Sequence, residues 1–247
     1  MLGPDLSGLN ICHLQCNAGQ DTLSLVSRLK AQNPIGVDIS DVAIDFATKL
    51  SEQSGMKATF IRSDVFDFFD DVQWHNQFDL VFVSYGALNW LSDIKRWGRG
   101  VSNILKLGGR LCLIEFHPTM SMFNYDMVRD YPYSSNGVAM SEPSGVSDYV
   151  GRSGKEGEDL MPDLKFKAGV QDFRNTSPSH EFCWGLADVI NSLLTTGVQL
   201  TELKEYPYSN FCKTYATMRE EKVEEGTRWY PEEPMLPMMF SIQATKH

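Results

Sequence analysis

The stretch that decides the fold is NICHLQCNAGQDTLSL at residues 10–25. It begins with a short apolar run, passes through a polar turn that ends at Gly19, and continues with Leu23, Val26 and Leu29 spaced three residues apart. The apolar run predicts a buried strand, and the spacing predicts one buried face of a helix. The stretch is therefore a strand–turn–helix unit whose turn presents free backbone N–H groups at the start of the helix.

The alternation of strands and helices continues along the first half of the chain. Ser40 predicts the N-cap of a second helix, and Gly55 predicts its left-handed end. A further helix before residue 110 has an apolar face from Leu91 to Leu105. Such alternation is typical of βαβ units in a parallel sheet. Five apolar runs predict the strands, at residues 10–14, 35–38, 58–62, 78–84 and 110–116.

The pattern changes at Pro118. Residues 118–180 are rich in Gly, Ser, Pro and Asp and contain few periodic segments, which is typical of an insertion. Long loops in compact domains are usually functional, so we expect this insertion to recognise the substrate. After it, residues 181–195 predict an amphipathic helix, and residues 200–206 and 238–245 predict two strands that pair antiparallel.

Length and composition favour one globular domain. The 247 residues are 42% hydrophobic, and the formal net charge is −10. This negative field disfavours nucleic acid and anionic membranes as partners. The cysteines and histidines show no metal-ligand spacing, so no metal is predicted. No apolar run reaches the ~20 residues of a membrane span and no signal peptide is visible, so we expect a cytoplasmic protein. The expected parts of the single domain 1–247 are a cofactor-binding half at 9–117, the insertion at 118–180, and a C-terminal helix and strand pair at 181–247.

Polar groups fall at the ends of consecutive predicted strands. In an open parallel sheet these ends meet at one edge, where ligands bind. Asp38 lies about 20 residues after Gly19, the spacing at which an acid binds ribose hydroxyls. Asp64 is placed to accept the amino proton of an adenine, and Tyr85 to face a cationic sulfur. Asp38 as a helix-dipole partner, Asp64 as a surface turn acid and Tyr85 as a core aromatic remain open alternatives. The cofactor-binding candidates are Gln15, Cys16, Asn17, Gly19, Thr22, Asp38, Ile39, Asp64, Val65, Ser84 and Tyr85.

Together the segment ICHLQCNAG, Asp38, Asp64 and the strand FDLVF at residues 78–82 resemble motifs I to IV of class I S-adenosylmethionine-dependent methyltransferases. The segments HLQC and GQDT are similar to a small-molecule subgroup of that superfamily. The resemblance implies a Rossmann-like α/β fold with three αβα layers. Its doubly wound sheet would have seven mostly parallel strands and an antiparallel C-terminal strand. The implied cofactor is S-adenosyl-L-methionine.

Three positions depart from the glycine-rich motif of this family. His13 stands where the family has an acid, and Gln15 and Asn17 stand where it has glycines, which leaves only Gly19. The methionine part of S-adenosylmethionine has no pyrophosphate, whereas a dinucleotide needs the close backbone approach that glycines allow. The departures therefore count more against a nicotinamide dinucleotide than against a methyl donor.

Candidate catalytic groups lie near the same edge. Methyl transfer depends chiefly on orientation, and a base of suitable pKa helps when the acceptor is a hydroxyl. His117 follows the fifth strand and is the first choice as base; His180 is the second, and Tyr85 is a further candidate. Helix capping or structural hydrogen bonding is an open alternative for both histidines, and His13 is expected to be a buried scaffold residue. The expected substrate pocket contains Asn89, Trp90, Glu115 and Trp184, although backbone capping by Glu115 and core packing by Trp90 remain alternatives.

The leading hypothesis is a methyltransferase that moves a methyl group to a hydroxyl or nitrogen of a small molecule. One alternative is an NAD(P)-dependent oxidoreductase of Rossmann type, which would share Asp38 but would need the fuller glycine motif and a Tyr-x-x-x-Lys pair that the sequence lacks. The other is a cofactor-binding protein without catalysis. The acceptor and the oligomeric state are not encoded in any readable motif.

Overall fold

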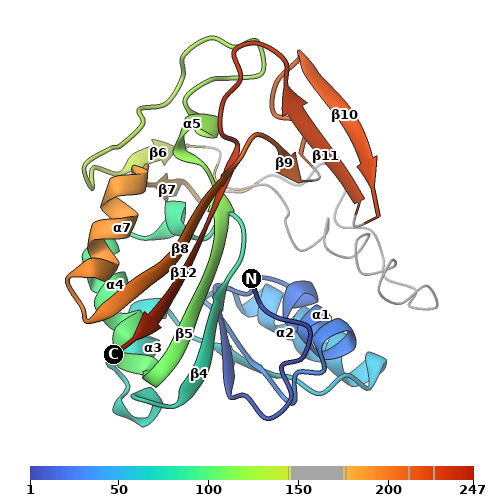
Figure 1. Cartoon of the computed structure of the whole chain (residues 1–247), viewed down its shortest axis with the longest axis vertical. Coiled ribbons are helices and arrows are strands. Elements are labelled where there is room, and N and C mark those ends of the chain that lie inside the picture. Colours follow the sequence, from blue (N-terminus) through green and yellow to red (C-terminus); the bar gives the residue numbers. More distant parts are fainter. Residues whose placement is uncertain (144, 146–174, 176, 211, 225) are drawn as a thin grey trace.

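A seven-stranded sheet forms the centre of the protein (Figure 1). The computed structural model describes residues 1–143, 145, 175, 177–210, 212–224 and 226–247. The strand order is β3-β2-β1-β4-β5-β12-β8. Strands β1 to β5 pair parallel, and β12 pairs antiparallel with both β5 and β8. The strands of this sheet are β1 (Ile11–Leu14), β2 (Ile35–Asp38), β3 (Thr59–Arg62), β4 (Phe78–Val83), β5 (Leu105–Phe116), β8 (Val198–Tyr206) and β12 (Met239–Lys246).

Helices cover both faces of the sheet. Side chains along β1 alternate between two apolar clusters: Ile11 packs with Leu25 of α1, whereas Cys12 and Leu14 pack with the cluster that includes Trp97 of α4. Both clusters are buried, so the sheet is the middle of three αβα layers, and the predicted fold class is confirmed. The helices are α1 (Gln20–Leu29), α2 (Asp41–Ser54), α3 (Val65–Asp70), η1 (Val72–Trp74), η2 (Leu88–Trp90), α4 (Ile94–Ile104), α5 (Pro118–Ser121) and α7 (Leu186–Leu194).

Local signals fix the ends of α2 as the sequence predicts. The Ser40 hydroxyl accepts the backbone N–H of Ala43 at 3.2 Å, and Gly55 ends the helix in a left-handed conformation with φ 68°. Because the cap at Ser40 sits directly after Asp38, the helix start also fixes the carboxyl end of β2. This edge of the sheet is where the candidate site lies.

Two predicted boundaries are wrong. The helix predicted at 181–195 begins only at Leu186, because Ser179–Glu181 forms strand β7, which pairs with β6 (Met140–Glu142). The strand predicted at 110–116 begins at Leu105, and its register against β4 shifts between Leu105 and Arg110. In both cases partners in the tertiary structure override the local pattern.

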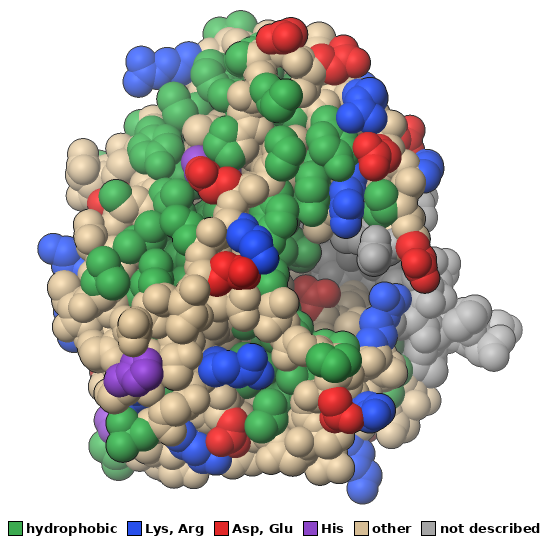
Figure 2. Space-filling model, in the orientation of Figure 1, with side chains coloured by type: hydrophobic (Ala, Val, Ile, Leu, Met, Phe, Trp, Pro, Cys, Tyr) green, Lys and Arg blue, Asp and Glu red, His purple; other side chains and the backbone are tan. Residues whose placement is uncertain are grey.

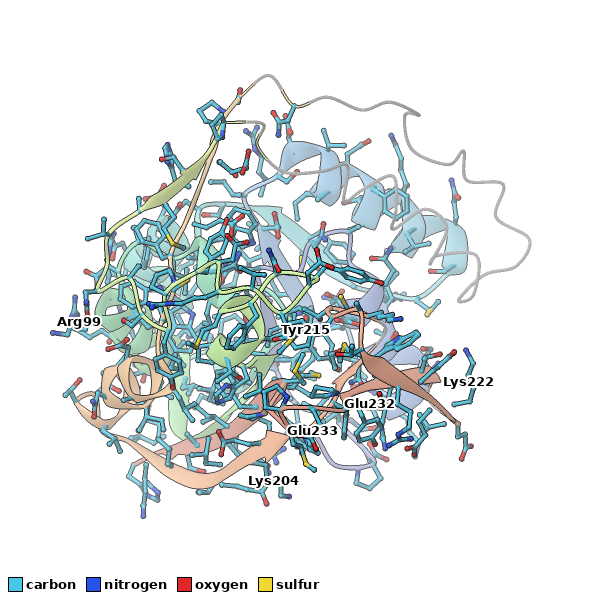
Figure 3. The ribbon with its side chains drawn as sticks, turned by 90° about the horizontal axis from the view of Figure 1, so that it is seen from above. Arg99, Lys204, Tyr215, Lys222, Glu232 and Glu233 are labelled. Carbon is cyan, nitrogen blue, oxygen red and sulfur yellow. The ribbon has the colours of Figure 1, made fainter. Side chains whose placement is uncertain are left out.

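A small sheet that the sequence analysis did not predict stands beside the carboxyl edge (Figure 1). It consists of β9 (Ser209–Asn210), β10 (Met218–Val223) and β11 (Gly226–Pro231), in the order β10-β11-β9. Tyr215 anchors it: the ring is fully buried and its hydroxyl donates to the Met120 carbonyl at 2.9 Å. Figure 3 shows Tyr215 inside the molecule and Lys222 at the outer end of the hairpin. The small sheet is thereby fastened to the segment after β5.

None of the helices in the described part of the chain is long and apolar enough to cross a membrane. Nearly half of the predicted insertion at 118–180 falls on residues 146–174, which lie outside the described residues, so its expected role in substrate recognition stays a prediction.

Candidate functional site

A cavity of ≈ 1190 Å³ opens at the carboxyl edge of the parallel strands. Figure 2 shows this face of the molecule hollowed between the β10–β11 hairpin and helices α1 and α2. The cavity brings together twelve predicted site residues from nine separate stretches of the sequence. These are Gln15, Asn17, Asp38, Ile39, Asp64, Val65, Tyr85, Asn89, Trp90, Glu115, His117 and Trp184. The predicted residues that do not line it are Cys16, Gly19, Thr22, Ser84 and His180.

The turn after β1 keeps the backbone shape of a glycine-rich loop. Gln15 and Asn17 have φ of 52° and 47°, and Gly19 has φ of 81°. A Cβ at Gly19 would lie 2.7 Å from the Cβ of Ala47 and 2.7 Å from the ring of Phe60, so only glycine fits there. The two substitutions relative to the family motif are therefore accommodated in a left-handed backbone, and the loop still leads into the start of α1.

Asp38 joins this loop to the start of α2. Its carboxylate accepts the backbone N–H of Asn17 at 2.8 Å through Oδ2 and that of Ser40 at 2.9 Å through Oδ1. Burial raises the pKa of Asp38, while the N–H groups of Ser40, Asn17 and Ile39 act in the opposite direction. Asp38 is thus both a structural tie and a carboxylate on the cavity wall.

The next rim position is Asp64, which caps α3. Its Oδ1 accepts the backbone N–H of Phe66 at 2.7 Å, and the residue lines the cavity together with Val65. On the other side of Asp38, Ile39 is 64% exposed yet also lines the cavity, as a hydrophobic lip. Apolar walls flanked by two carboxylates suit a flat heterocycle with hydrogen-bond donors at its edge.

His13 holds three elements together behind the cavity wall. The ring is fully buried, Nδ1 lies 2.7 Å from the Thr22 hydroxyl of α1, and Nε2 lies 3.0 Å from the Ser84 hydroxyl after β4. Cys16 is buried nearby in the same turn, and its backbone N–H donates to Val37. His13, Thr22 and Ser84 therefore position the loops from within instead of facing a ligand.

Stability should fall in acid because of His13. Burial lowers its pKa to about 4 from an ordinary 6.5, so the unfolded chain binds a proton between these pH values that the folded chain does not. The free energy of unfolding therefore decreases as pH drops from 6.5 towards 4, with about 2–3 kcal/mol due to this group.

Chemical denaturation of the wild type and His13→Gln at pH 7 and pH 4.5 measures this. The difference in the free energy of unfolding between pH 7 and pH 4.5 should be smaller in His13→Gln than in the wild type. It should equal the wild-type difference in His247→Gln, because His247 is exposed. An equal pH dependence in all three proteins would contradict the assignment.

Glu115 organises the loop after β4. Its buried carboxylate accepts the backbone N–H groups of Ala87 at 2.8 Å, Leu88 at 3.0 Å and Phe116 at 2.7 Å, as well as that of Gly86. Burial raises its pKa, and these hydrogen bonds act to lower it. Glu115 also lines the cavity, but all of these bonds go to the backbone, as the capping alternative anticipates.

Tyr85 leaves the loop that Glu115 shapes and reaches the cavity. Its hydroxyl accepts a hydrogen bond from the Asn210 side chain of β9 at 3.3 Å, and its ring lies 5.8 Å from that of Phe116. Burial raises the pKa of Tyr85, so the phenol stays protonated at neutral pH. Through Asn210, the small C-terminal sheet is bonded to a residue of the cavity wall.

The two candidate histidines lie in different surroundings. His117 is buried, lines the cavity and caps α5, with Nδ1 accepting the Thr119 N–H at 3.2 Å and Nε2 lying 2.8 Å from Glu205 Oε1. Burial lowers the pKa of His117, which Glu205 counteracts. His180 is exposed on β7 and its Nδ1 lies 2.9 Å from the Ser141 hydroxyl. The cavity includes its neighbour Glu181 but not His180, as the alternation of side chains along a strand requires.

Sequence reasoning missed the far wall of the cavity. It is formed by acidic and aromatic residues at the end of β5, in the segment after it, and at the end of β7 and just beyond, namely Phe116, Phe123, Asp130, Tyr131, Glu181 and Phe182. Residues 179–183 read SHEFC, three polar residues followed by two apolar ones, so no polar–apolar alternation indicated a strand there.

Two amide oxygens on the cavity wall have no partner among the described residues. Gln15 Oε1 and Asn89 Oδ1 are buried, although the Gln15 amide nitrogen donates to the Ala87 carbonyl at 2.8 Å. Buried acceptors without donors are costly, so they point to a ligand that brings donors. The ammonium, ribose hydroxyls and adenine amino group of S-adenosylmethionine are such donors, and the residues present therefore fit this cofactor.

Comparison with known proteins agrees with this geometry. The chain matches the family model described as "Methyltransferase domain" over residues 5–160. No curated protein sequence matches it. Its fold is similar to that of an S-adenosylmethionine-dependent methyltransferase from Mesorhizobium loti, with 17% identity, 99% of this chain and 94% of that chain covered, and a TM-score of 0.59. It is also similar to the structure of a "putative S-adenosylmethionine dependent methyltransferase" from Listeria monocytogenes, with 16% identity, 100% of this chain and 94% of that chain covered, and a TM-score of 0.61.

A third similar structure is geranyl diphosphate C-methyltransferase from Streptomyces coelicolor, in complex with S-adenosyl-L-homocysteine (11% identity, 100% of this chain and 74% of that chain, TM-score 0.54). At such identities these structures bear on the fold, whereas the family model spans more than half of the sequence. The chain belongs to the methyltransferase-domain family, and the resemblance to class I S-adenosylmethionine-dependent methyltransferases is confirmed.

Proposed function

We propose that the protein transfers a methyl group from S-adenosylmethionine to a hydroxyl or nitrogen of a small molecule bound in the same cavity. The observation that carries this proposal is the continuity of one cavity from the Asp38 and Asp64 rim to the wall formed by Phe182 and Trp184. At ≈ 1190 Å³ it exceeds the ~300–1,000 Å³ of a typical small-ligand pocket, so a nucleoside and a second molecule fit together.

The rim residues provide complementary groups for the donor. Asp38 accepts from the ribose hydroxyls, Asp64 accepts from the adenine amino group, and Ile39 and Val65 cover the heterocycle. The carbonyl oxygen of the Gln15 side chain accepts from the ammonium of the methionine part. When bound, the donor supplies a methyl group activated by a positively charged sulfur.

Catalysis then depends on the alignment of donor and acceptor and on the removal of one proton from the acceptor. Holding the two reactants in line supplies up to about 7–11 kcal/mol of barrier reduction. His117 is the base candidate on the cavity wall, because its lowered pKa keeps the ring neutral and Glu205 Oε1, 2.8 Å from Nε2, stabilises the ring once it is protonated. The nitrogen that takes the proton is then Nδ1, which exchanges its hydrogen bond from the Thr119 N–H for the proton of the acceptor. Tyr85 presents a protonated hydroxyl on the same wall.

Replacing His117 with alanine should lower the rate of transfer by about 10²–10³-fold and change donor affinity by less than threefold. His117→Asn is the matched control, because asparagine still caps α5 but has no imidazole. Single-turnover transfer of a labelled methyl group measures both. If His117→Asn restores the wild-type rate, His117 is a helix cap and not the base.

The nicotinamide alternative is not favoured by the site. Asp38, Asp64 and Glu115 line the cavity, and no lysine or arginine does so in the described ranges. Such walls repel a pyrophosphate. Calorimetric titration with S-adenosylhomocysteine and with NAD tests the donor, and binding of NAD alone would refute the proposal. Binding of S-adenosylhomocysteine without transfer to any of a panel of hydroxyl and amine metabolites would support a non-catalytic role instead.

A further inference from the structure

The end of the cavity remote from Asp38 combines acidic and aromatic side chains. We call it the acceptor end, and it consists of Trp90, Asp130, Tyr131, Glu181, Phe182 and Trp184. Strand β7 supplies Glu181, and strand β6 places a further carboxylate near it: Glu142 pairs with Ser179, two residues before Glu181, so Glu142 and Glu181 lie diagonally on one face of the ladder.

The carboxylates at the acceptor end repel one another. Burial raises the pKa of Glu181, and Glu142 raises it further. Burial also raises the pKa of Tyr131, to which Glu181, Asp130 and Glu142 each add. No lysine or arginine lines the cavity among the residues that the structure describes. A positively charged ligand would therefore be attracted to Glu181 and Asp130, the two carboxylates that line this end of the cavity.

The aromatic rings of the acceptor end are held in fixed positions. Those of Phe182 and Trp184 stack at 6.2 Å with 11° between their planes. Trp184 Nε1 donates to the Leu91 carbonyl at 2.9 Å, and the Phe182 backbone N–H donates to the Asn89 carbonyl at 2.8 Å. The Nε1 bond holds the Trp184 ring and the backbone bond holds the chain at Phe182. Both residues line the cavity, and aromatic faces attract cations, tryptophan most strongly.

Asn89 adds an independent sign of a ligand. Its side-chain oxygen Oδ1 is buried, lies on a residue of the cavity wall, and has no hydrogen-bond partner in the described part of the chain. An acceptor atom of this kind calls for an N–H or O–H from the ligand. An ammonium group meets all three features: the carboxylates, the aromatic faces and the amide oxygen.

We propose that the methyl acceptor carries an ammonium group, and that Glu181 with the rings of Phe182 and Trp184 binds it at the acceptor end. This inference rests on the proposed function, since it names the substrate class of the same cavity. It selects amines over neutral alcohols and over carboxylates or phosphates of similar shape.

The test uses three probes of one shape and different charge: 2-phenylethylamine, 2-phenylethanol and phenylacetate. Each is titrated calorimetrically at neutral pH into the full-length protein, both free and saturated with S-adenosylhomocysteine. The amine should bind at least about tenfold more tightly than either of the others. Equal affinities, tighter binding of the alcohol or the carboxylate, or no binding of the amine would each overturn the inference.

Glu181→Gln locates the effect. This substitution should weaken the binding of 2-phenylethylamine by about tenfold, and it should leave the affinities for 2-phenylethanol and S-adenosylhomocysteine unchanged. Glu232→Gln is the matched control, because Glu232, labelled in Figure 3, is exposed just after β11. It does not line the cavity. Full amine affinity in Glu181→Gln refutes the role of Glu181. Failure of S-adenosylhomocysteine to bind the wild type refutes the donor assignment instead, and the charge preference is then still measured on the free protein.

Discussion

Replacing Glu115 with alanine will lower the free energy of unfolding by at least about 4 kcal/mol. The substitution leaves four backbone N–H groups without their acceptor, those of Gly86, Ala87, Leu88 and Phe116. Each unsatisfied buried donor costs about 1–3 kcal/mol. The same change frees the loop that carries Tyr85, so donor affinity should fall together with stability.

Urea denaturation of three variants measures the effect. Glu115→Gln keeps the size of the side chain and one good acceptor, so its loss should be smaller than that of the alanine variant. Glu224→Ala, at an exposed position after β10, should change the free energy by less than about 0.5 kcal/mol. A loss of only about 1 kcal/mol in Glu115→Ala would show that the four hydrogen bonds do not hold this loop.

Replacing Asp38 with alanine will weaken the binding of S-adenosylhomocysteine by at least about tenfold. Charge-assisted hydrogen bonds to the ribose contribute about 1.5–3 kcal/mol each. The substitution also releases the Asn17 N–H, which donates to Asp38 at 2.8 Å, so the loop after β1 loses an attachment.

Calorimetric titration and thermal unfolding separate binding from folding in this variant. The affinity of Asp38→Asn for S-adenosylhomocysteine should lie between those of Asp38→Ala and the wild type, because asparagine keeps one carbonyl oxygen. Asp41→Ala is the matched control, because Asp41 is an exposed acid at the start of α2, three residues after Asp38, and does not line the cavity. An affinity in Asp38→Ala equal to that of the control would remove Asp38 from the site.

The parallel half of the fold could be predicted because its signals are local. Apolar runs, the Ser40 cap and the Gly55 terminator each depend on residues within a few positions of one another. Once consecutive strands run parallel, their carboxyl ends meet at one edge, so the turn at Gln15, Asp38 and Asp64 could be placed together without coordinates.

The loop and the histidines needed the structure. The sequence shows that Gln15 and Asn17 replace glycines, and only the backbone shows that both keep positive φ. It shows that His13 replaces an acid, and only packing shows that the ring ties Thr22 to Ser84 behind the cavity wall. His117 and His180 look alike as residues near turns, but one faces the cavity and the other faces outward.

By itself the sequence determined the strand and helix order of the first half and the edge of the sheet at which Gln15, Asp38 and Asp64 meet, because these follow from periodicity and from the direction of the chain. The tertiary structure decided the acceptor end, where Met140 pairs with Glu181 across a long intervening segment, and the Tyr215 anchor of the C-terminal sheet. Such pairings join residues distant in sequence, and their stability comes from burial and hydrogen bonds that form only when the chain has folded.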